Sequence, residues 1–180
     1  MSTSSKKRIL FVNNFNRNVI ASARSLYRDY DIDICVQTEI PGTYSKAFSD
    51  VFSCPDPTED YGAFEAKVLE LAGSREYAMV LPFGIKTTLA TSRFADRVRE
   101  IGPAVPLSEY DLIESLHDKK RCFQSAEAFG LPVPRTYYYS SVEELLDLDI
   151  TFPVIVKPRK YSGIDKRFGV VHSKAELERL

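Results

Sequence analysis

Apolar residues recur along the first hundred residues in two alternating patterns. Short runs of consecutive aliphatic residues are typical of buried strands, and apolar residues three or four positions apart are typical of helices with one buried face. The expected strands are 9–12, 32–36, 79–82 and 104–106. The expected helices are 19–30, 60–73 and 85–101. Strands that alternate with helices in this way predict an open parallel sheet with right-handed crossovers.

A second set of elements follows residue 106. A helical stretch over 108–129 breaks near Asp118, which is a good N-cap for its second piece, and Gly130 is typical of the residue just beyond a helix end. The remaining expected elements are a strand at 135–139, a helix at 141–146, a hairpin with strands 154–156 and 169–171, and a helix from 173. We therefore expect an α/β domain, a helical connector and a second lobe, with the ranges 1–106, 107–130 and 131–180.

The carboxyl ends of parallel strands form the edge at which such sheets bind ligands. In this chain that edge carries Thr38 and the turns 13–18 and 83–87. The turn 13–18 has no glycine, which disfavours the close backbone approach to a pyrophosphate that a dinucleotide site requires. Arg17 and Asn18 are candidates to contact an anion such as a carboxylate at the start of the next helix. The alternative is that Asn18 caps this helix and that Arg17 is solvated.

The hairpin of the second lobe has a basic tip. Its first strand ends at Lys157, and Pro158 stops the ladder because proline has no N–H to donate. The polar tip that follows includes Lys160, Ser162, Gly163, Lys166 and Arg167. Ammonium groups and backbone N–H groups that converge on one loop suit a polyphosphate. A solvated basic tip without a ligand is the alternative interpretation.

Several motifs, taken in order, resemble the ATP-grasp superfamily, above all its carbamoyl-phosphate-synthase-like branch and related carboxylate–amine ligases. They are Asp-Lys at a helix start (118–119), Gly-Leu-Pro-Val-Pro-Arg-Thr (130–136), and Pro-Val-Ile-Val-Lys-Pro (153–158) before a glycine-bearing loop. The resemblance spans nearly the whole chain but only the front part of the family pattern. It implies an α/β fold in which a Rossmann-like parallel-sheet pre-ATP-grasp domain precedes the incomplete first lobe of an ATP-grasp fold.

The resemblance also implies an activity, that of an ATP-dependent carboxylate–amine ligase acting through an acyl phosphate. Lys119 and Lys157 match lysines that contact ATP phosphates, and Ser162 and Gly163 match the loop that closes over them, although this loop has fewer glycines and serines than is usual. Mg²⁺ is implied too, with its ligands outside this chain. The expected partners are ATP and a small carboxylate. A non-catalytic relative used for nucleotide sensing or protein contact is the alternative, and the glycine-free first turn argues against an NAD-dependent dehydrogenase.

Composition narrows the class of protein. The chain is 44% hydrophobic and 27% charged, as expected for a globular protein, and its net charge of −1 argues against a nucleic-acid-binding domain or a polybasic membrane surface. Its three cysteines and two histidines lack the spacing of metal ligands. With no signal-peptide pattern and no long apolar run, we expect a cytoplasmic protein, and a homo-oligomer is compatible with the sequence.

Overall fold

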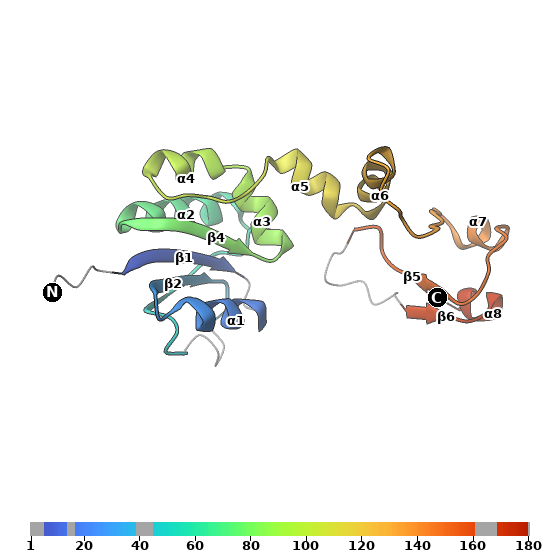
Figure 1. Cartoon of the computed structure of the whole chain (residues 1–180), viewed down its shortest axis with the longest axis horizontal. Helices are drawn as coiled ribbons and strands as arrows, with labels where there is room; N and C mark the ends of the chain where they lie inside the picture. Colours follow the sequence, from blue (N-terminus) through green and yellow to red (C-terminus); the bar gives the residue numbers. More distant parts are fainter. Residues whose placement is uncertain (1–5, 14–16, 39–44, 161–168, 180) are drawn as a thin grey trace. The chain divides into compact units, whose positions relative to one another are not determined.

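The computed structural model describes residues 6–13, 17–38, 45–160 and 169–179. They belong to two compact units, Met1–Tyr110 and Asp111–Leu180, which Figure 1 shows with their helices and strands. The boundary falls at the first residue of the helix α5 (Tyr110–His117). Among the described residues, no helix combines the length and the apolar character that crossing a membrane requires.

The first unit is built on a four-stranded sheet in the order β3-β2-β1-β4, and all of its strand pairs are parallel. The strands are β1 (Lys7–Asn13), β2 (Tyr30–Val36), β3 (Asp50–Ser53) and β4 (Tyr77–Phe83). The helices are α1 (Arg17–Leu26), α2 (Tyr61–Ser74), α3 (Ile85–Ser92) and α4 (Ala95–Ile101). The α/β fold class expected from the sequence is confirmed.

The sheet separates two apolar layers. Leu10 and Val12 of β1 pack with buried residues of α2, α3 and α4, whereas Ile9 and Phe11 pack on the side that carries Val19 of α1. Successive residues of a strand point to opposite faces, so a run of apolar residues fills both layers at once. Figure 1 shows α1 on one face of the sheet and α2 and α4 on the other.

Three expectations for this unit were wrong. The strand β3 was not expected, because it has only four residues and lies at the sheet edge, so its residues are at most half-buried. The expected helix 85–101 is two helices, since the chain leaves helical geometry at Phe94, whose buried ring packs edge-on against Phe64 of α2. The expected strand 104–106 is a single bridge between Ala104 and Met79.

The second unit contains four helices and a hairpin among its described residues. Besides α5, they are α6 (Lys119–Ala128), α7 (Val142–Leu146), β5 (Val154–Val156), β6 (Gly169–Val171) and α8 (Lys174–Leu177). Asp118 caps α6 by accepting from the backbone N–H groups of Lys120 and Arg121, and Gly130 follows α6 with a φ of 70°. Both expectations for this helix are therefore confirmed.

The expected strand 135–139 is wrong. This segment has no ladder partner among the described residues, and two of its tyrosines, Tyr138 and Tyr139, are 37% and 41% exposed. Its side chains make separate contacts with other segments instead: the Tyr137 hydroxyl donates to the Asp149 carbonyl at 3.2 Å, and the Lys120 ammonium lies over the Tyr138 ring. Aromatic residues favour strands mainly through packing on a sheet face, and without a neighbouring strand the preference has no effect.

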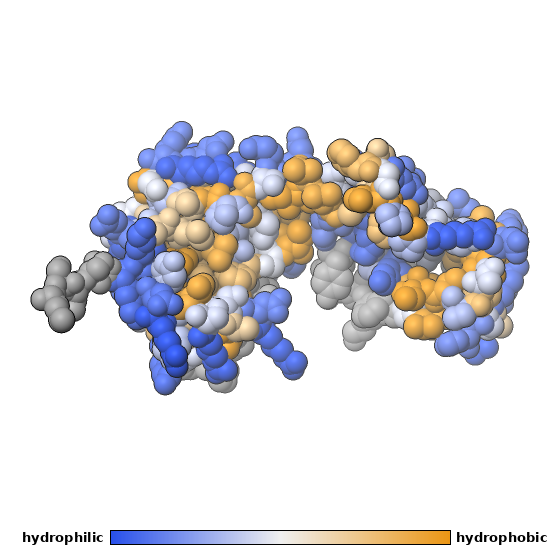
Figure 2. Space-filling model, in the orientation of Figure 1, coloured by the Kyte–Doolittle hydropathy of each residue, from blue (hydrophilic) through white to orange (hydrophobic). Residues whose placement is uncertain are grey.

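The hairpin β5–β6 has one covered face and one open face. On the covered side, Val171 packs with Leu145 of α7 and Leu177 of α8. On the other side, the cross-strand pair of Ile155 and Val170 is 62% and 57% exposed. Figure 2 shows apolar surface over this hairpin. The packing of the covered face fixes the direction in which β5 delivers the residues that follow it.

Candidate functional site

A basic segment, Lys157–Lys160, leaves the end of β5 beside the start of α6. Its first residue, Lys157, is exposed immediately after the last strand residue, as the sequence predicts. The backbone N–H of Lys119 donates to the Arg159 carbonyl at 3.1 Å. Residues about forty positions apart in the chain therefore meet at one point of the second unit.

A bidentate ion pair fastens this meeting point. Nε of Arg159 donates to Oδ1 of Asp118 at 2.7 Å, and Nη2 of Arg159 lies 2.7 Å from Oδ2. The Asp118 carboxylate is 1% exposed and caps α6 at the same time, whereas the Arg159 side chain is 54% exposed. Two parallel hydrogen bonds fix the orientation of a guanidinium more firmly than a single contact does.

Lys119 takes part in the same junction. Its ammonium donates to the Pro158 carbonyl at 2.8 Å and lies 3.5 Å from the Arg159 carbonyl. An ammonium has one further N–H beyond these two contacts, which leaves it a donor for a ligand. Lys119 therefore ties α6 to the segment after β5 and keeps some capacity to bind an anion.

A second carboxylate balances the outer cations. Glu114 of α5 accepts from Lys160 and, at 2.9 Å, from Nη1 of Arg121. These contacts hold the pKa of Glu114 below its ordinary value, with the hydrogen bond from Lys160 as the main cause. The neighbouring His117 has a buried Nε2 without a hydrogen-bond partner in the described part of the chain. Burial, followed by the charge of Lys119, lowers the pKa of His117, so the ring is neutral at pH 7.

The Asp118 carboxylate is expected to make the free energy of unfolding depend on pH in the acid range. The hydrogen bond from Arg159 is the main cause that lowers the pKa of Asp118 to about 2, against about 3.9 in an unfolded chain. A lowered pKa stabilises the folded state above the unfolded value, and this contribution is lost as the pH falls from about 4 to about 2. The free energy of unfolding should therefore fall more steeply over this window in the wild type than in Asp118→Asn. Equal slopes would contradict the assignment.

The other predicted site residues are placed as follows. Ser162 and Gly163 lie outside the described residues. Arg17 and Asn18 are the first two residues of α1 and are exposed. Asn18 is the second residue of α1, and both interpretations of it, an anion contact and a helix cap, stay predictions.

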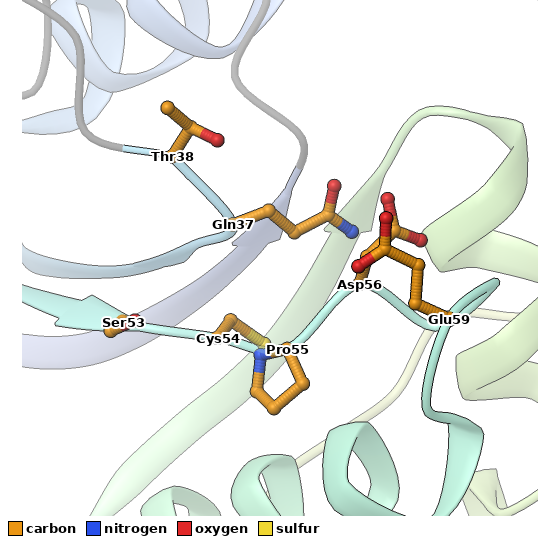
Figure 3. Close-up of a pocket in the computed structure, with 7 residues that line it drawn as sticks. All are labelled: Gln37, Thr38, Ser53, Cys54, Pro55, Asp56 and Glu59. Atoms are coloured by element: carbon orange, nitrogen blue, oxygen red, sulfur yellow. The ribbon is translucent and has the colours of Figure 1, made fainter.

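A polar pocket of about 470 Å³ lies in the first unit, where β2 and β3 end. Thr38, expected at this edge, lines it together with Gln37, Ser53, Cys54, Pro55, Asp56 and Glu59. Figure 3 shows the amide of Gln37 and the carboxylates of Asp56 and Glu59 turned toward the same space. Ser53 could not be chosen from the sequence, because β3, which ends at this residue, was not expected. No group of three or more histidine, cysteine or acidic residues suited to a metal occurs in the described ranges.

The sequence and the structure of this chain were compared with those of known proteins. No family model matches the sequence, and no curated protein matches it either. Solved structures do match. An L-amino acid ligase from Bacillus licheniformis has a TM-score of 0.72 and 16% identity, over 98% of this chain and 42% of that one.

Two further similar structures carry different activities in their names. N5-carboxyaminoimidazole ribonucleotide synthetase from Thermotoga maritima has a TM-score of 0.64 and 13% identity, over 97% of this chain and 43% of that one. The biotin carboxylase domain of Hydrogenobacter thermophilus 2-oxoglutarate carboxylase was solved in complex with MgADP, ADP and bicarbonate. It has a TM-score of 0.61 and 18% identity, over 96% of this chain and 39% of that one.

These structures are ATP-grasp enzymes, and this chain spans less than half the length of each. At such low identities the likeness establishes the fold and nothing finer. The chain has the fold of the N-terminal part of an ATP-grasp enzyme, a Rossmann-like parallel-sheet domain followed by the start of the ATP-grasp domain, as the motifs of the sequence indicate.

Proposed function

We propose that this chain is the N-terminal portion of an ATP-dependent carboxylate–amine ligase and that Lys157, together with Lys119, binds the phosphates of the nucleotide. The observation that carries the proposal is the junction at which Asp118 and Lys119 hold the basic segment Lys157–Lys160 against the start of α6. The fold supports it, because similar structures were solved with ADP and with MgADP. Cations fixed in place before the ligand binds stabilise phosphate charge without reorganisation.

The proposed reaction has two steps. A carboxylate oxygen of the substrate attacks the γ-phosphorus of ATP, and ADP leaves with the electrons of the broken P–O bond. The amine nitrogen of the second substrate then attacks the acyl carbon, loses a proton to a base, and expels inorganic phosphate. In phosphoryl transfer of this kind the protein supplies mainly position and positive charge. Lys157 and the remaining donor of Lys119 would supply positive charge here. Mg²⁺, held by ligands expected outside this chain, would neutralise further charge on the phosphates.

The acyl-phosphate step can be tested with an isotope. The full-length native protein is incubated with Mg-ATP, a panel of amines and carboxylates labelled with ¹⁸O in both oxygens. For the true substrate pair we expect ADP and inorganic phosphate that carries one ¹⁸O atom, measured by mass spectrometry. Nucleotide binding without ADP release for any pair would contradict the ligase and favour a non-catalytic relative that senses nucleotides or contacts other proteins.

A further inference from the structure

The Arg159 guanidinium has an unused edge. Its Nε and Nη2 atoms contact Asp118, but a guanidinium carries more N–H donors than these two contacts use. More than half of the Arg159 side chain is exposed, whereas its carboxylate partner is almost fully buried. A guanidinium fixed along one edge presents a rigid, planar pair of donors along the other, the geometry that suits phosphate oxygens.

Positive charge dominates the surroundings of this edge. Two carboxylates, Glu114 and Asp118, face a larger group of cations around the junction. The cations that contacts place there are Lys119, Arg121, Arg159 and Lys160. An excess of one sign in a small region raises the local concentration of an oppositely charged ligand. The ligand that fits best is therefore a polyanion.

Among these cations, Arg159 is the one best placed to bind phosphate oxygens. The Lys119 ammonium already donates to carbonyl oxygens, and the ammonium of Lys160 is paired with Glu114. Arg159 keeps several donors, and its orientation is set by Asp118. We infer that Arg159 is an additional polyphosphate-binding residue of this site and that Asp118 is the positioning residue that aims it. The inference rests on the proposed nucleotide site.

The test measures the Kd of Mg-ATP, and of inorganic tripolyphosphate as a probe without a nucleoside, by calorimetry on the full chain. Arg159→Ala should weaken both ligands about fivefold, the loss of one hydrogen-bonded contact. Arg159→Lys keeps the charge but cannot contact Asp118 and phosphate at the same time as a guanidinium does. It should raise both Kd values about threefold. Arg135→Ala removes an exposed arginine of the same unit and should change neither Kd.

The positioning role is tested by a double variant. Asp118→Asn retains a cap for α6 but weakens the contact that orients Arg159, so by itself it should raise both Kd values about threefold. When it is added to Arg159→Ala, it should raise them no further. The losses should also shrink at high salt, because ionic contacts are screened. If the wild type binds and neither Arg159 variant changes the Kd by more than twofold, the inference is overturned while the proposed function stands. If the wild type binds neither ligand, the proposed function fails and the inference with it.

Discussion

Replacing Asp33 with alanine is expected to lower the free energy of unfolding of the first unit by about 3 kcal/mol. Asp33 lies in β2 with a side chain that is 0% exposed. Its Oδ1 accepts from Nη1 of Arg8 at 2.6 Å, and its Oδ2 accepts from Nη1 of Arg75 at 2.8 Å and from the hydroxyl of Tyr77 at 2.7 Å. Removal of the carboxylate leaves a buried hydroxyl without its acceptor and two arginines without their shared partner.

The pKa of Tyr77 supports this view of the cluster. Burial, together with the hydrogen bond to Asp33, raises the pKa of the Tyr77 hydroxyl above its ordinary value, so the group is protonated and donates at pH 7. Hydrogen bonds from buried donors to a charged acceptor are among the stronger polar contacts in proteins. The expected loss therefore comes from several contacts that end on one carboxylate.

Asp31 provides a matched control on the same strand. Its carboxylate is 38% exposed and contacts only Arg8 in the described structure, at 3.2 Å. Asp31→Ala should therefore cost less than about 1 kcal/mol, as is usual for exposed ion pairs. Urea unfolding compares the two variants, with the midpoint shifted and the m-value unchanged. Similar losses for Asp33→Ala and Asp31→Ala would contradict the account of the buried cluster.

The second large effect concerns the proposed nucleotide site. Lys157→Ala should raise the Kd of Mg-ATP by about 10- to 100-fold, because a charge-assisted hydrogen bond contributes about 1.5–3 kcal/mol. Lys157 is the exposed cation delivered directly by the end of β5, and its backbone is held by the packing of the hairpin. Lys157→Arg, which keeps the charge, should recover part of the affinity. Calorimetric titration of the full chain measures the series.

Lys46→Ala controls for the loss of a positive charge as such, because Lys46 is an exposed lysine of the first unit. Its Kd should equal that of the wild type. If Lys157→Ala also binds as tightly as the wild type, Lys157 does not contact the nucleotide, and the phosphate site must be sought elsewhere in the chain.

Local signals made part of this structure predictable. The cap at Asp118 and the glycine after α6 are short-range features, and the hairpin follows from two apolar runs around a polar tip. Each is decided by residues within a few positions of one another. The main sheet was also predictable in outline, because strands buried on both faces are apolar over their whole length.

Features that depend on distant residues were not predictable. Asp33 sits in an apolar strand, and its partners come from β1, from the residue after α2, and from β4. The pairing of Asp118 with Arg159 joins residues 41 positions apart. The edge strand β3 and the break at Phe94 are likewise set by what packs against them. In each case a contact made in three dimensions overrides the local pattern.

The central claim is that the chain carries the phosphate-binding part of a nucleotide site. The measurement that tests it most directly is a calorimetric titration of the full-length wild-type protein with Mg-ATP. We predict a saturable heat that fits one site and that tripolyphosphate displaces. No heat of binding up to millimolar nucleotide would contradict the claim and leave this chain as a relative in fold alone.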